Sequence, residues 1–172
     1  MSKKTANDNR TFKKGDYIVY PAHGVGRVTG VEKESVAGFD IEVYVVSFEQ
    51  DKMTLRVPTA RAEASGMRPL ANDKVVKDAL KTLGGKAKVK RTMWSRRAQE
   101  YEAKINSGDL ISIAEVVRDL HRDEDQPEPS YSERQLYESA LDRMARELAA
   151  VEEVPREEAL DILAKNLRKA AA

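Results

Sequence analysis

Apolar and polar residues alternate along the first 70 residues of the chain. The stretches "DYIVYPAHGVGRVTGVEKE", "FDIEVYVVSFE" and "KMTLRVP" are rich in valine, isoleucine, tyrosine and phenylalanine. In the second stretch Ile41, Val43 and Val45 fall on one face of an extended chain. This period of two predicts β-strands. The glycines between the runs, together with Gln50-Asp51, predict turns or bulges.

From residue 72 the spacing of apolar residues changes to that of a helix. Gly84-Gly85 ends one stripe and Gly108 ends another, while Asp109, the Ser130–Glu133 pair and Pro155 mark helix starts. The four clearest stripes are Val75, Val76, Ala79, Leu80 and Leu83; Trp94, Ala98, Tyr101 and Ile105; Leu110, Ile113, Val117 and Leu120; and Leu136, Ala140, Met144, Leu148 and Val151.

These patterns predict an α+β chain of two modules. The first is a small SH3-like or Tudor-like β-barrel, closed by Pro58 and Pro69. The second is an all-α bundle of about five helices. We expect a flexible tail over residues 1–11, the β module over 12–70 and the helical module over 71–172.

Charge is distributed unevenly, although the formal net charge is only +1. Residues 1–73 carry a net charge of +1, residues 74–104 of +7 and residues 105–172 of −7. A basic block followed by an acidic block is an electrostatic pattern that suggests an anionic partner for the basic part.

The basic block contains the only tryptophan of the chain. In "KAKVKRTMWSRR", Trp94 is surrounded by cations and no acidic residue interrupts the run. Cations displace counterions from phosphates, and a flat aromatic side chain can stack on a base or enter the minor groove. The helical stripe that begins at Trp94 equally allows this residue to be part of the core. From spacing alone both interpretations stay open.

We find no constellation of residues that suggests an enzyme, a metal site or a cofactor. There are no cysteines, and the two histidines, His23 and His121, are far apart. The "HGVG" stretch lacks a third glycine, since Thr29 occupies that position, and it opens a strand where a nucleotide loop opens a helix. "GGKA" at 84–87 has Ala87 where a P-loop needs serine or threonine. We therefore expect no catalytic residues, no metal and no cofactor.

The sequence also carries no sign of export or membrane insertion. The start, "MSKKTANDNR", is polar, and no apolar run approaches the roughly 20 residues that cross a bilayer. The absence of cysteine fits a reducing compartment. We expect a cytoplasmic protein that is not associated with membranes.

Four motifs, in order along both modules, resemble the CarD/CdnL family of bacterial transcription regulators. They are "FKKGDYIVYPAHGVGRV", "LRVP", "MWSRR" and "SGDLISIAEVVRDLHR". The first half is also similar to the polymerase-interacting domain of transcription-repair coupling factors. The resemblance implies a regulator that binds the RNA polymerase β subunit and stabilises the open promoter complex, and it leads us to expect a monomer.

The resemblance further implies two sets of contact residues. The strand "MTLRVP" would contact polymerase through its edge, and Arg56 would add a charge-assisted contact. Trp94 would act as a wedge at the upstream fork, from the minor-groove side. The expected polymerase contacts are Arg56, Thr54, Leu55 and Val57. The expected DNA contacts are Trp94, Arg96 and Arg97 from the motif, with Lys86, Lys88, Lys90 and Arg91 added by their charge.

One position departs from the family pattern, and two alternative functions stay open. Glu34 stands where some relatives carry a basic residue, which would weaken the polymerase contact or move it to Lys33. The terminal "LRKAAA" could serve as a degradation signal or be a frayed helix end. The alternatives are a KOW-like RNA-binding protein, or a protein-interaction adaptor in which Trp94 belongs to the core.

Overall fold

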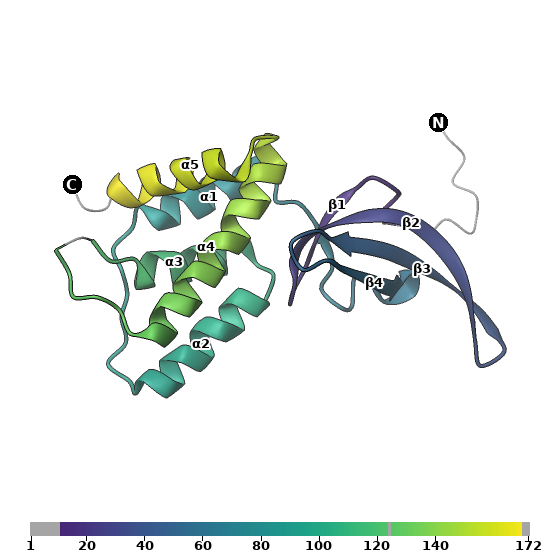
Figure 1. The fold of residues 1–172 in the computed structure, drawn as a ribbon, viewed down its shortest axis with the longest axis horizontal. Coiled ribbons are helices and arrows are strands. Elements are labelled where there is room, and N and C mark those ends of the chain that lie inside the picture. The colour runs from purple at the N-terminus through teal and green to yellow at the C-terminus, as the bar shows by residue number, and fades with distance from the viewer. Residues whose placement is uncertain (1–10, 124, 170–172) are drawn as a thin grey trace. The chain divides into compact units, whose positions relative to one another are not determined.

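The computed structural model describes residues 11–123 and 125–169 of the chain (Figure 1). It divides into two compact units, with the boundary between Pro69 and Leu70. Most of the expected N-terminal tail, and the last three alanines of the suggested degradation signal, lie outside the described residues. No helix in the part that is described is long and apolar enough to cross a membrane.

The N-terminal unit is a five-stranded antiparallel sheet with the order β4-β3-β2-β1-β5. β2 and β3 form a long curved hairpin (Figure 1). The sheet confirms the predicted Tudor-like β module. The elements are β1 (Tyr17–Tyr20), β2 (Gly24–Val36), β3 (Phe39–Phe48), β4 (Met53–Pro58), a short 3-10 helix (Thr59–Arg61) and β5 (Arg68–Pro69).

Aromatic and branched side chains from one face of the sheet form the core of this unit. Tyr44, Val46 and Phe48 alternate along β3 and are fully buried, and Phe12 packs edge-on against Tyr44. Val43 on the opposite face of β3 is also buried. β3 is therefore covered on both faces, which explains why its sequence is a nearly continuous apolar run.

The second glycine of "HGVG", Gly26, is explained by the packing around it. It lies within β2, opposite Ile18 of β1. A Cβ atom at this position would come within 2.7 Å of the Phe48 ring and 2.8 Å of Val46. The glycine is required for close packing against the aromatic core, and the bulge in this strand falls further along, between Val28 and Gly30.

The C-terminal unit is a bundle of α1 (Asp73–Leu83), α2 (Trp94–Asn106), α3 (Leu110–Leu120), α4 (Tyr131–Glu152) and α5 (Arg156–Lys169). α3 packs against α1, α2 and α4, while α5 packs against α1 and α4. Most residues of the predicted stripes belong to the core or pack against it. Its fully buried members include Ala79, Leu83, Val116, Val117, Met144 and Leu163.

The predicted helix starts are confirmed, with two differences in detail. Asp109 and Ser130 accept hydrogen bonds from Ser112 N and Glu133 N. The Glu133 carboxylate, however, pairs with Arg122 at 2.6 Å, so the reciprocal half of the expected capping box is diverted to an ion pair. The last helix begins at Arg156, one residue after Pro155.

Candidate polymerase and nucleic-acid contact surfaces

β4 is an edge strand of the sheet. It pairs with β3 on one side, and no strand lies on its other side within the described chain. Thr54 and Arg56 are exposed, Leu55 is half-buried, and Val57 is buried in the core with 5% of its surface exposed. The strand therefore has free main-chain groups along one edge, while the Val57 side chain is committed to the interior.

Arg56 forms ion pairs with two acidic residues of β2. Its guanidinium reaches across β3 to the carboxylates of Glu32 and Glu34. The hydrogen bond to Glu34, followed by the charge of Glu32, raises the pKa of the Arg56 guanidinium above its ordinary value. No local pattern in the sequence indicates this pairing, because it joins residues 22 and 24 positions apart.

Lys33 lies between these two acids on β2. Because successive side chains of a strand point to opposite faces, Lys33 faces away from the side on which Arg56 meets Glu32 and Glu34. A polymerase contact moved from position 34 to Lys33 would therefore lie on the opposite face of the sheet from Arg56.

Trp94 is the first residue of α2 and is half-buried. Its ring packs against the edge of the helical core and lies 6.2 Å from the Tyr101 ring, measured between centroids. The indole Nε1 donates a hydrogen bond to Ser132 Oγ on α4 at 2.8 Å. Trp94 is thus partly packed and partly accessible, and Met93 beside it is 77% exposed.

The arginines that follow Trp94 differ in their surroundings. Arg96 is exposed, and its side chain makes no ion pair with any described residue. Arg97 is half-buried, with its guanidinium carbon 5.3 Å from the centroid of Trp94 and 5.7 Å from that of Tyr101. Its Nη2 donates to the Tyr101 hydroxyl at 3.2 Å. Arg96 faces solvent, whereas Arg97 is held against two rings of its own helix.

The lysines of the basic run lie in the loop between α1 and α2. Lys86, Lys88, Lys90 and Arg91 are all exposed. Lys90 pairs with Glu100 at 3.3 Å, and the backbone N–H of Lys88 donates to Asp119 at 2.9 Å, which ties the loop to α3. The charges of Lys86, Lys88 and Arg91 have no acidic partner within the described residues.

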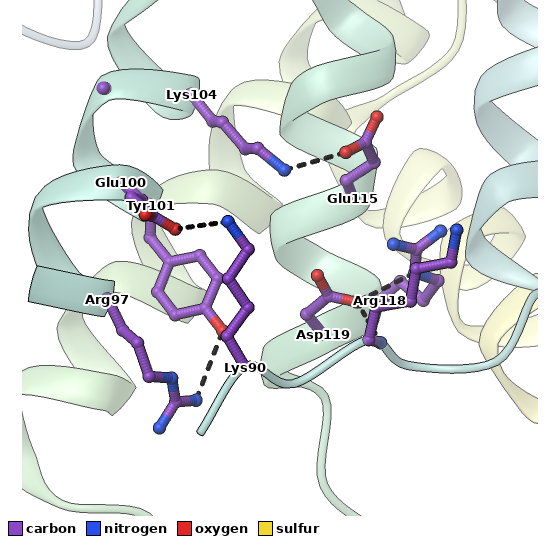
Figure 2. A pocket seen from close by; sticks show the side chains of 10 residues that line it. Lys90, Arg97, Glu100, Tyr101, Lys104, Glu115, Arg118 and Asp119 are labelled. Carbon is purple, nitrogen blue, oxygen red and sulfur yellow. Dashed lines mark hydrogen bonds and ion pairs between the residues drawn. The ribbon is translucent and has the colours of Figure 1, made fainter. Parts of the chain in front are cut away.

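A pocket of about 410 Å³ lies between this loop, α2 and α3 (Figure 2). Two ion pairs line it: Lys104 of α2 pairs with Glu115 of α3 at 2.8 Å, and Arg118 pairs with its neighbour Asp119 at 2.9 Å. Cations are in excess over acids. The charged lining residues are Lys88, Lys90, Arg97, Lys104 and Arg118, with Glu100, Glu115 and Asp119.

No group of three or more histidine, cysteine, aspartate or glutamate side chains suited to holding a metal occurs in the part of the chain that the structure describes. The His23 ring lies beside those of Tyr20 and Phe48, with centroids 5.8 and 5.5 Å away. His121 Nδ1 lies 3.1 Å from the Tyr137 hydroxyl. Both histidines are thus in contact with aromatic residues of their own unit.

Comparison with known proteins matches both units to families. Residues 12–71 match the family model of the CarD-like/TRCF RID domain, and residues 78–164 match that of the CarD C-terminal domain. The chain is also similar to YdeB of Bacillus subtilis (strain 168), to which the role of transcription factor is provisionally assigned. The two are 28% identical over 140 residues, which cover 81% of this chain and 92% of YdeB.

Proposed function

The chain belongs to the CarD family of transcription regulators, and from this premise we propose that it docks on the RNA polymerase β subunit and stabilises the open promoter complex. The match of both units, in the family's order, is the observation that carries the proposal. The KOW-like RNA-binding alternative would account for the β module alone and would leave residues 78–164 unexplained.

The position of β4 supports docking through this strand. A free strand edge can add a strand from a partner, because main-chain hydrogen bonds supply affinity and side chains supply specificity. Thr54, Leu55 and Arg56 offer side chains at this edge, and Val57 contributes main-chain groups only. Arg56 then adds a charge-assisted hydrogen bond to an acidic group of the β subunit.

The pairing of Arg56 with Glu32 and Glu34 sets a condition on this contact. An acidic group on polymerase has to compete with two carboxylates that already neutralise the guanidinium. Exposed ion pairs contribute little, so such an exchange is feasible, but it lowers the net gain from docking. Glu34, the residue that departs from the family pattern, would thus weaken the polymerase contact by pairing with Arg56.

The surroundings of Trp94 support a DNA contact for the helical unit. The indole is half-exposed at the start of α2, next to exposed Arg96 and to the loop that carries Lys86, Lys88 and Arg91. In the proposed complex the cations hold the backbone and the indole enters the upstream fork from the minor-groove side. Lys90 takes part after giving up its exposed pair with Glu100.

The expected energies are sufficient for a regulator. Stacking one base on an aromatic side chain is worth about 1–3 kcal/mol. This would shift an equilibrium between closed and open promoter complexes by roughly five- to 150-fold. Docking on polymerase raises the local concentration of such a weak, sequence-tolerant DNA contact. The two units therefore have complementary roles in one mechanism.

Docking is tested by measuring binding of the full chain to immobilised β subunit. Arg56→Glu reverses the proposed contact charge and should reduce binding at least tenfold. Arg61→Glu is the matched control, because Arg61 is an exposed arginine of the same unit, in the short 3-10 helix. Equal binding of wild type and Arg56→Glu, or an equal loss in both variants, would contradict docking through this edge.

A further inference from the structure

Trp94 is held by a helix that is distant in sequence. The residue that receives its hydrogen bond, Ser132, lies 38 positions later in the first turn of α4. The indole has a single polar atom, the Nε1–H group, which can only donate. A bond of 2.8 Å from this atom to Ser132 Oγ therefore fixes how the plane of the ring is turned about its attachment to α2.

A second restraint comes from Arg97, one turn further along α2. Its guanidinium lies over the Trp94 ring and also over Tyr101, a buried residue of the helical core. The Nε atom of Arg97 is buried and has no hydrogen-bond partner among the described residues. Contact with the two rings, and the bond to the Tyr101 hydroxyl, keep this side chain in place. The indole is thus held from two directions.

We infer that Ser132 is a positioning residue, which presets the orientation of Trp94 for entry into DNA. The inference rests on the DNA-contact role proposed above for Trp94. A wedge that is ordered before binding does not lose rotational freedom when it inserts, so more of the stacking energy is retained in the complex. Without Ser132 Oγ, the exposed indole N–H would donate to water instead. The N–H would still be hydrogen-bonded, but the indole would lose its fixed orientation.

The chain offers a matched control for this test. Ser132 is the second residue of α4, and Ser95 is the second residue of α2, directly after Trp94. Both are exposed, and Ser95 makes no hydrogen bond through its side chain to the rest of the described chain. Ser132→Ala and Ser95→Ala therefore remove the same hydroxyl from the same helical position, but only the first removes the bond to Trp94.

The first measurement uses Trp94 as its own probe, since it is the only tryptophan. Time-resolved fluorescence anisotropy of the free, full-length protein should show a faster and larger local motion in Ser132→Ala than in wild type. Ser95→Ala should match wild type. Ser132→Thr keeps a hydroxyl at this position and should also match wild type. Unchanged anisotropy in Ser132→Ala would overturn the restraint without bearing on the proposed function.

The second measurement is the lifetime of the open complex formed with RNA polymerase. Since one hydrogen bond contributes modestly, Ser132→Ala should shorten the lifetime about two- to tenfold relative to wild type, with Ser95→Ala and Ser132→Thr unaffected. A mobile indole with an unchanged lifetime would overturn the positioning role. An unchanged lifetime with folded, polymerase-binding Trp94 variants would instead refute the proposed DNA contact of Trp94.

Discussion

Arg56 of the edge strand β4 is ion-paired to Glu34 of β2, across the intervening strand β3. Arg56, which we expect to contact polymerase, is therefore paired with Glu34, the residue that departs from the family pattern. Glu32 forms a second pair with the same guanidinium. The two acids compete with any acidic group that a partner presents to Arg56.

This competition predicts the effect of neutralising Glu34. Glu34→Gln keeps the size of the side chain but removes one of the two charges that hold Arg56. Binding to the RNA polymerase β subunit should become stronger by no more than about fivefold, because exposed pairs contribute little. The measurement is equilibrium binding at low and at physiological salt. Weaker binding would mean that Glu34 contacts polymerase directly.

The packing of Gly26 predicts a loss of stability in the N-terminal unit. Gly26→Ala would force a methyl group into the Phe48 ring and Val46, and should lower the free energy of unfolding by about 1–3 kcal/mol. Gly30→Ala is the control, since a Cβ at Gly30 of the same strand meets nothing within 4 Å. Urea unfolding followed by tyrosine fluorescence measures both. Equal stability of the two variants would contradict this account of the motif.

Tyr137 predicts a dependence of helical stability on alkaline pH. Burial raises the pKa of this phenol above its ordinary value. The unfolded phenol loses its proton at a pH of about 10, whereas the folded protein still holds it. The unfolded state therefore binds fewer protons, and the free energy of unfolding falls as pH rises through this range.

Tyr137→Phe should remove the part of this fall in unfolding free energy that the Tyr137 phenol causes. Its unfolding free energy, followed by circular dichroism in urea, should fall less than that of wild type when pH is raised from 8 to values above 10. The variant also lacks the contact with His121, so the change with pH is compared and not the absolute stability. Tyr131→Phe, which alters an exposed tyrosine of the same helix, is the control. An equal fall in wild type and Tyr137→Phe would contradict the prediction.

The regular parts of the fold could be predicted from sequence because their signals are local. Stripes such as Leu110, Ile113 and Val117 determine a helix and its buried face from residues within three or four positions. The caps Asp109 and Ser130 act within three residues. The family motifs likewise pointed to both units, as the matches to residues 12–71 and 78–164 confirm.

The surroundings of the proposed contact residues could not be predicted in this way. The pairing of Arg56 with Glu32 depends on strand order, and the bond from Trp94 to Ser132 depends on how α4 packs near α2. Both join residues that are distant in sequence. The question whether Trp94 belongs to the core or to the surface also had no local answer, because its position in the structure combines the two.

The central claim is tested most directly by the lifetime of the open promoter complex with wild type and with two variants of Trp94. Trp94→Leu keeps an apolar side chain against the core, and Trp94→Ala removes it, while circular dichroism reports whether each is folded. We predict that folded variants bind polymerase normally and shorten the lifetime roughly five- to 150-fold, the range expected for one lost stacking contact. A folded variant that binds polymerase and preserves the full lifetime would contradict the wedge.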